Sequence, residues 1–171
     1  GIGYTKAAGN YGGAFYPTSQ AIKEGYNQVI WTDHKEHKYI EESGTMNLML
    51  LIGDTFVTPP LTDRILAGVT RRSIITLVKE QGWAIEERPV TVDEIVAAAR
   101  TGALKEAFGM GTAAVVSQID TIGHEGTNYA IPTPIDGKAM EIKHLLNDIR
   151  LGRTPDTNQW MVDVVQPTSA E

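Results

Sequence analysis

The chain has 171 residues, of which 42% are hydrophobic and 21% are charged, a length and composition that fit one globular domain and exclude a disordered protein. The net charge is −6 and the largest basic cluster is Arg71-Arg72, which argues against binding through a basic face, so we expect no nucleic-acid partner. The chain has no cysteine, which excludes disulfides and favours the cytoplasm, and no apolar run of membrane-spanning length, so we expect no membrane partner.

The first half of the chain predicts one short helix and several strands. It opens with GIGYTKAAGNYGG, in which glycines surround Lys6, and such a run suits either a mobile tail or a close approach of the backbone to a ligand. Residues 17–25 are typical of a short helix and residues 27–31 of a short buried strand. Further on, two apolar runs flank Gly53-Asp54, a dipeptide that favours a tight hairpin between two buried strands.

The second half alternates helices with strands, which indicates an α/β fold. The apolar spacing over 69–81 predicts a helix. Thr91 or Asp93 is expected to cap another helix over 94–100, with Gly102 in its stop signal. The remaining predictions are a strand at 83–90, a strand at 111–123 entered through a glycine turn, a loop at 123–137, a helix at 138–151 and a closing segment at 158–165.

Three turns of small residues carry polar groups that can meet a ligand. Glu42 stands beside a glycine turn and just before a buried strand, so its carboxylate is either exposed or faces the interior, where it needs a partner. Gly68 precedes the helix at 69–81, whose first amides form a natural anion site together with the Thr70 hydroxyl. In GMGTAA, Thr112 offers a hydroxyl and an amide, although a plain tight turn before a strand has the same pattern.

Together these groups match the requirements of a pyridoxal phosphate site. A lysine such as Lys6 can form a Schiff base with the cofactor, an acid can hold the pyridine nitrogen protonated, and amides and hydroxyls can bind the phosphate. The histidines indicate no competing metal site, because His34 and His37 lie in a polar segment without a convincing carboxylate pattern. The three tryptophans are expected to be core or interface aromatics.

Five motifs follow one another along nearly the whole chain: YTKAAGNYGG, EESGTMN, LTDRILAGVTRRS, IEERPVT and LKEAFGMGTAAVVS. Their order and approximate spacing resemble the carboxy-terminal part of the branched-chain amino acid aminotransferases, which are fold-type IV pyridoxal phosphate enzymes. The resemblance implies a mixed sheet or pseudo-barrel surrounded by helices, in a single cofactor-binding domain over 1–171. It also implies an amino-terminal small domain that is absent from this chain.

The resemblance implies a role for each candidate residue. Lys6 would hold the cofactor as a Schiff base and would move the α-proton of the substrate. Tyr11 would hydrogen-bond the phenolic oxygen of the cofactor, and Glu42 would pair with its pyridine nitrogen. The implied phosphate ligands are Val69, Thr70 and Thr112, and the implied contacts to the substrate carboxylate are Thr45 and the Ala113 amide.

The activity that the resemblance implies is transamination of leucine, isoleucine and valine with 2-oxoglutarate, which gives 2-oxo acids and glutamate. The expected partners are these small molecules and a second subunit in a homodimer. D-amino acid aminotransferase and aminodeoxychorismate lyase share the lysine and the acid and remain alternatives, although GTMN after Glu42 favours the branched-chain group. A further alternative is a noncatalytic domain that binds phosphate or cofactor weakly.

Three departures from the family pattern bear on these expectations. Ala67 stands where many relatives have proline, which should loosen the turn before the helix but leave its amides available. Ala114 and Ser117 occupy the places of a C-x-x-C pair found in some relatives, so that thiol switch is excluded. The chain begins five residues before Lys6, and the small domain would supply an arginine to the phosphate and part of the side-chain pocket.

Overall fold

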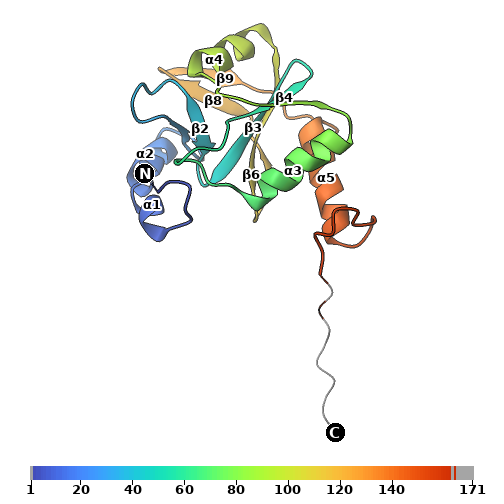
Figure 1. Cartoon of the computed structure of the whole chain (residues 1–171). Coiled ribbons are helices and arrows are strands. Elements are labelled where there is room, and N and C mark those ends of the chain that lie inside the picture. Colours follow the sequence, from blue (N-terminus) through green and yellow to red (C-terminus); the bar gives the residue numbers. More distant parts are fainter. Residues whose placement is uncertain (1, 163, 165–171) are drawn as a thin grey trace.

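A computed structural model describes residues 2–162 and 164 of the chain. It contains a seven-stranded mixed sheet, a separate two-stranded sheet and helices that pack against both faces of the large sheet (Figure 1). No helix in the described part of the chain combines the length and apolar character needed to cross a membrane. The helices are α1 (Ala8–Gly12), α2 (Phe15–Lys23), α3 (Val69–Glu80), α4 (Val92–Thr101) and α5 (Lys138–Arg150); the strands are β1 (Ile30–Thr32), β2 (Ile40–Ser43), β3 (Met46–Ile52), β4 (Thr55–Thr58), β5 (Ala84–Glu87), β6 (Leu104–Gly111), β7 (Val115–Gln118), β8 (Thr121–His124) and β9 (Thr127–Ala130).

Strand β3 lies at the centre of the large sheet because both of its edges are paired. Its first residues pair with β2 and its last residues with β4, while β6 runs antiparallel along the opposite edge. β1 extends the sheet from β2, β7 extends it from β6, and β5 runs parallel to β4 after the crossover through α3. The register sets Asn47 between Glu42 of β2 and Met110 of β6. The β2–β3 and β6–β7 turns therefore lie at the same end of the sheet.

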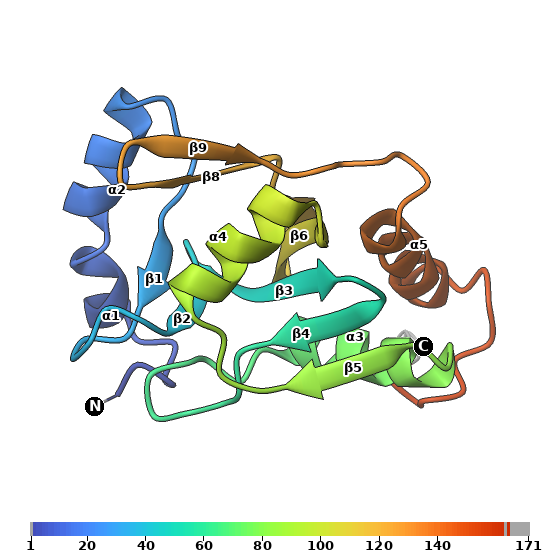
Figure 2. The same ribbon diagram turned by 90° about the horizontal axis from the view of Figure 1, so that it is seen from above.

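Two apolar cores cover the two faces of this sheet. Met49 and Leu51 of β3 pack in the core formed with α3 and α5, whereas Leu48 and Leu50 pack in the core formed with α4. Figure 2 shows α4 across the sheet from α3. Because successive side chains of a strand point to opposite faces, a strand buried on both faces is apolar throughout, which explains the run LMLLI in β3.

Most elements predicted from the sequence are confirmed. α3 and α5 match the predicted helices closely, and β1, β5 and α2 overlap the segments expected for them. Thr91 caps α4 by accepting a hydrogen bond from the Glu94 amide, and Gly102 ends the helix in the left-handed region at φ 71°. Gly53 has φ 58° in the β3–β4 hairpin, a conformation that a residue with a side chain rarely adopts.

The predictions for residues 111–137 are wrong. The single strand expected at 111–123 is two strands, β7 and β8, which belong to different sheets. The loop expected at 123–137 contains β9, which pairs with β8 through a turn at Glu125 and Gly126, both with positive φ. LKEAFGMG forms β6, a strand that has no counterpart in the prediction, and the opening segment contains the short helix α1. Long-range pairing with β3 stabilises β6, and such pairing leaves little local signal in the sequence.

The closing segment predicted at 158–165 lies partly outside the described residues, because 163 and 165 are not described. Trp160 is half-buried and packs against the core beside α3 and α5, as does Trp83, which agrees with the expectation of core aromatics. The segment around Trp160 therefore lies against the core on this face of the sheet, whereas Val162 after it is 84% exposed.

A buried carboxylate joins β6 to the start of α5. Glu106 is 5% exposed, and its two oxygens accept hydrogen bonds from the Lys138 amide at 2.7 Å and the Ala139 amide at 2.9 Å. These are first-turn amides with no partner inside the helix, and the carboxylate also lies at the positive end of the helix dipole. A Cβ at Gly137 would come within 2.8 Å of both carboxylate oxygens, so a glycine is needed there for this close approach.

We expect Glu106→Ala to lower the free energy of unfolding by about 2–3 kcal/mol, because it leaves two amides without acceptors and removes charge-assisted bonds. Chemical denaturation followed by circular dichroism measures the change. Glu141→Ala is the matched control, since Glu141 lies exposed on the same helix in a surface ion pair with Lys138 and its removal should change stability by less than about 1 kcal/mol. Equal losses in the two variants would contradict the capping role.

Candidate active site

A cleft of about 600 Å³ opens where the amino-terminal segment meets the end of the sheet and the start of α3. Seven of the eight residues singled out from the sequence line it, and they come from segments far apart in the chain. Ala113 is not among the lining residues; it lies exposed in the β6–β7 turn beside Thr112. The seven lining residues are Lys6, Tyr11, Glu42, Thr45, Val69, Thr70 and Thr112.

Lys6 and Tyr11 face each other at the rim of the cleft. The Lys6 ammonium donates a hydrogen bond to the Tyr11 hydroxyl at 3.2 Å, and it lies 5.2 Å from the centre of the tyrosine ring. Helix α1 starts two residues after the lysine and brings the two side chains together. Lys6 itself is exposed. Of the two interpretations of the glycine-rich opening, the structure supports a close approach to the cleft, since Gly3 and Gly13 also line it.

Glu42 on β2 faces the cleft and is partly buried, which excludes the interpretation of a freely exposed acid. Burial raises the pKa of its carboxyl from the ordinary value of 4.5 to about 7. The hydrogen bond from the Leu66 amide opposes this rise in pKa, the charge of Glu41 adds to it, and the charge of Lys6 opposes it. Among the described residues Glu42 has hydrogen-bond donors but forms no ion pair.

The turn between β2 and β3 is held in place by its surroundings. Gly44 has φ 58°, its amide donates to the Val29 carbonyl at 2.7 Å, and its carbonyl accepts from the Trp31 indole at 2.9 Å. Trp31 also lines the cleft, so it has a local role beyond the core or interface packing expected for the tryptophans. These contacts position Thr45, which is exposed at the cleft.

The amino end of α3 presents free backbone donors to the cleft. Its N-cap, Gly68, is in an extended conformation, and no side chain caps the helix. The first amides of the helix, at Val69 and Thr70, are consequently available to an anion, and the positive end of the helix dipole favours negative charge there. The Val69 side chain is 67% exposed and Thr70 is half-buried. Ala67, just before Gly68, is exposed and also lines the cleft.

Asn47 is a buried polar residue of this site that the sequence analysis did not single out. Its amide nitrogen donates to the Glu42 carboxylate at 3.0 Å and to the Leu66 carbonyl at 2.8 Å. The β2–β3 register sets Asn47 directly opposite Glu42, and β3 enters the core immediately after it. The only available signal was the two-residue turn at 44–45, from which this cross-strand pair follows once β2 and β3 are taken as a hairpin.

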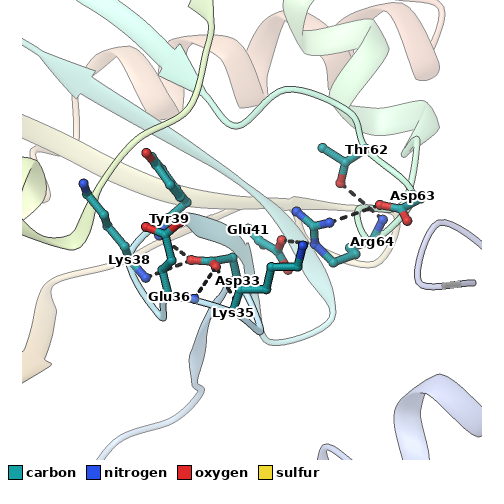
Figure 3. Close-up of polar contacts among 9 residues, drawn as sticks. All are labelled: Asp33, Lys35, Glu36, Lys38, Tyr39, Glu41, Thr62, Asp63 and Arg64. Carbon is teal, nitrogen blue, oxygen red and sulfur yellow. Dashed lines mark hydrogen bonds and ion pairs between the residues drawn. The ribbon is translucent and has the colours of Figure 1, made fainter.

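The wall beside Glu42 is more charged than the sequence indicated. Arg64 lines the cleft and donates to the Glu41 carboxylate at 2.5 Å and to the Asp63 carboxylate at 3.2 Å (Figure 3). The pKa of Arg64 is raised chiefly by its hydrogen bond to Glu41. Because both acids are partners of the arginine, Arg64 does not offer an unpaired cation to the cleft.

The loop after β1 folds around the buried carboxylate of Asp33 (Figure 3). Its oxygens accept hydrogen bonds from four backbone amides, and these bonds, the one from Glu36 foremost, hold the pKa of Asp33 far below its usual range. His34 and His37 lie exposed in this loop. No group of three or more histidine, aspartate or glutamate residues within the described ranges is arranged to hold a metal ion. The four amides are those of Lys35, Glu36, Lys38 and Tyr39.

Comparison with known proteins identifies the family of the chain. The family described as amino-transferase class IV matches residues 4–122, and the chain belongs to this family. A probable branched-chain-amino-acid aminotransferase from Staphylococcus aureus (strain N315) is 40% identical over 165 residues, which cover 96% of this chain and 46% of that protein. The chain thus spans about half the length of the curated relatives it matches.

Solved structures agree with this assignment. The crystal structure of the branched-chain amino acid aminotransferase from Escherichia coli matches with a TM-score of 0.79 and 27% identity over 96% of this chain and 51% of that one. The pyridoxal phosphate form of the Thermobaculum terrenum enzyme matches with a TM-score of 0.71 and 25% identity over 90% of this chain and 47% of that one. The predicted mixed α/β fold of type IV is confirmed.

The raised pKa of Glu42 predicts a pH-dependent stability of the ligand-free protein. Because its folded pKa of about 7 exceeds the ordinary 4.5, the folded state binds the extra proton between these values, and the free energy of unfolding falls as the pH rises from 4.5 through 7. Glu42→Gln has no carboxyl to titrate at this position and therefore lacks this pH dependence. At pH 8 we expect its free energy of unfolding to exceed that of the unsubstituted protein by about 2 kcal/mol. This is less than the free energy equivalent to the full pKa shift, because the carboxyl remains partly solvated.

Urea denaturation at pH 4 and pH 8 measures this effect, and the difference between the two proteins should grow with pH. Glu125→Gln, at an exposed position in the β8–β9 turn, controls for the change in net charge. A stability difference for Glu42→Gln that is the same at both pH values would refute the role assigned to burial.

Proposed function

We propose that this chain is the cofactor-binding part of a branched-chain amino acid aminotransferase, which uses pyridoxal 5'-phosphate to transfer the amino group of leucine, isoleucine or valine to 2-oxoglutarate. The observation that carries the proposal is that one cleft contains the Lys6 amine, the Glu42 carboxylate and the uncapped start of α3. Relatives named for this activity match almost the whole chain, which supports the substrate class.

The residues of the cleft fit this cofactor by charge. The cofactor carries a pyridine nitrogen that binds a proton and, on a separate arm, an anionic phosphate. Glu42 has a partly buried carboxylate without an ion pair among the described residues, so a protonated ring nitrogen would supply the missing cation. The start of α3 offers amides and a favourable dipole to the phosphate, with the hydroxyls of Thr70 and Thr112 also in the cleft.

Lys6 is the residue proposed to hold the cofactor covalently and to move the proton. When bound, the cofactor supplies an electron sink that makes the α-proton of an amino acid removable. The amino group of the substrate would first displace Lys6 from its bond to the cofactor; the freed Lys6 Nζ would then take that proton and deliver it to the cofactor carbon that had been bonded to the lysine, which requires the amine to be neutral when it acts as a base. The Tyr11 hydroxyl, 3.2 Å from Nζ, would hydrogen-bond the phenolic oxygen of the cofactor.

The substrate carboxylate is assigned to the two turns at the end of the sheet. Thr45, exposed at the cleft, would donate its hydroxyl, and the Ala113 amide would donate from the β6–β7 turn. Ala113 directly follows Thr112, which lines the cleft, so its amide lies next to the cleft wall. Hydrogen bonds from neutral groups would fix the carboxylate without an additional charge.

The matched relatives are about twice as long as this chain, and the proposal covers the additional parts as well. On the family resemblance, the hypothesis includes a separate small domain, which would complete the side-chain pocket and the phosphate site. It also includes a cytoplasmic homodimer. The helices next to Lys6 are consistent with a covered position, since α1 and α2 have no buried residues and Phe15 and Tyr16 are 75% and 74% exposed.

Borohydride reduction tests the central assignment. The purified protein is incubated with pyridoxal phosphate, reduced, digested and analysed by mass spectrometry. We expect one peptide with a pyridoxyl mass, located at Lys6, because among the described residues it is the lysine that lines the cleft beside the acid and the anion site. Lys6→Ala should abolish both the label and the yellow colour.

Lys23→Ala, an exposed lysine in α2, is the matched control and should leave the label unchanged. A pyridoxyl mass only at another lysine would overturn the assignment. A chain that stays colourless, while a longer form of the protein turns yellow, would support the alternative of a noncatalytic domain for this chain.

Turnover assays separate the activities that share the lysine and the acid. We expect amino transfer from L-leucine and no activity with D-alanine or aminodeoxychorismate. The basis is that the matching relatives are named branched-chain aminotransferases and that GTMN follows Glu42. Turnover of D-alanine or release of pyruvate from aminodeoxychorismate in the absence of L-leucine activity would reassign the substrate.

A further inference from the structure

We propose that Asn47 is a positioning residue that couples the two ends of the cleft, by holding the Glu42 carboxylate and the turn before α3 with one side chain. The inference rests on the proposed function, since it concerns how the chain presents an acid to the ring nitrogen and amides to the phosphate. Asn47 itself would touch neither the substrate nor the reacting atoms. Its effect would pass through Glu42 and through residues 66–68.

The nitrogen of the Asn47 amide makes two hydrogen bonds within the site. Asn47 is 5% exposed, and its nitrogen donates to the Glu42 carboxylate at 3.0 Å and to the Leu66 carbonyl at 2.8 Å. The Leu66 amide donates to the same carboxylate oxygen at 3.1 Å, so acid, asparagine and turn form a closed set of three hydrogen bonds. Such a network fixes the acid and the turn relative to each other, because neither can move without breaking a partly buried hydrogen bond.

The oxygen of the Asn47 amide explains why residue 68 is glycine. Gly68 has φ −63° and ψ 134°, which any residue can adopt, so backbone freedom is not the reason. A Cβ built on Gly68 would collide with Oδ1 of Asn47. The glycine thus allows the asparagine to lie against the turn from which the helix starts. This contact forms the second half of the coupling, on the phosphate side of the cleft.

The chemistry of an amide suits this position better than that of a charged residue. A lysine or arginine at residue 47 would neutralise Glu42 and remove its attraction for a protonated ring nitrogen. An aspartate would add a second negative charge beside Glu42 and the neighbouring Glu41. Asparagine orients the Glu42 carboxylate through neutral donors and leaves the carboxylate charge available to the ring nitrogen. The charge of Lys6, on the opposite segment, also acts on Glu42.

The test is a double-mutant cycle of Asn47→Ala and Gly68→Ala, read by NMR of the bound cofactor. Pyridoxal phosphate labelled with ¹⁵N reports the ring nitrogen beside Glu42, and its ³¹P signal reports the phosphate at α3. We expect Asn47→Ala to shift both signals and to weaken cofactor affinity by about 10- to 100-fold, the effect of losing one hydrogen bond to a charged group.

Gly68→Ala is the sharper variant because its substitution lies on the phosphate side of the cleft and leaves both Asn47 and Glu42 in the sequence. Since its methyl group displaces the Asn47 side chain, we expect it to shift the ¹⁵N signal at the far end of the ring. In the Asn47→Ala background, Gly68→Ala should no longer move the ¹⁵N signal, because no asparagine remains to transmit the change. Asn158→Ala, which removes an asparagine bond to Glu80 away from the cleft, is the matched control and should move neither signal.

Two results would overturn the proposal. One is an Asn47→Ala protein in which only one of the two signals moves, since the side chain would then serve one end of the cleft alone. The other is an effect of Gly68→Ala on the ¹⁵N signal that is the same with and without Asn47. If Asn47→Ala does not fold, Gly68→Ala alone decides the question, and an unchanged ¹⁵N signal in that variant would also overturn the proposal.

A ligand-free measurement separates this inference from the proposed function. Amide hydrogen exchange of Leu66 and Gly68, whose amides donate to Glu42 and to the Leu66 carbonyl, should become about tenfold faster in both Asn47→Ala and Gly68→Ala, without additivity in the double variant. Unchanged exchange in Asn47→Ala would contradict the inference even if the protein binds pyridoxal phosphate. If the unsubstituted protein does not bind the cofactor, the proposed function fails, and the exchange cycle still decides whether Asn47 couples acid and turn.

Discussion

The hydrogen bonds that join Asn47, Glu42 and the turn before α3 are the interaction on which the cleft depends. Glu42 belongs to β2, Asn47 to the central strand and Leu66 to the crossover that leads into α3. Three segments separated in sequence thereby meet at one carboxylate, which is partly withdrawn from water and has a pKa of about 7. A cationic partner stabilises the charged form of such an acid. The packing of the sheet, which buries Glu42, therefore favours a ligand with a positive charge at this position.

The opposite wall of the cleft has a different physical character. Lys6 and Tyr11 lie in a segment that Asn10 holds together by bonds to the Ile2 and Thr5 carbonyls. The bond from the Tyr4 amide to the Asp63 carbonyl ties this segment to the rest of the chain. Short helices without buried residues contribute little stability of their own. The site therefore combines a base built on β2, β3 and α3 with a wall that has less buried contact and carries the Lys6 amine.

Local patterns predicted those elements whose signals are local. The apolar period of α3, the Thr91 cap and Gly102 stop of α4 and the hairpin at Gly53 all lie within a few residues of the structure they specify. β6 was not predictable in this way, because it depends on pairing with β3, which is distant in sequence. β7 and β8 each pair with a neighbouring strand through a tight turn, but the nearly continuous run from Val115 to His124 did not show that they belong to different sheets. Glu106 is the clearest polar case: no local signal in LKEAFG distinguishes it from other acids, yet it caps a helix 32 residues later.

The sequence by itself determined the chemical inventory of the site: one lysine among glycines, an acid before a buried strand, a glycine at a helix start, and the family order of five motifs. Residue types and their local turns are properties of the chain, so they can be recognised without coordinates. Only the tertiary structure decided that these groups share one cleft, that Glu42 is partly buried, and that Asn47 rather than backbone strain requires Gly68. Burial and cross-strand register arise from contacts between distant segments, and a linear pattern contains neither.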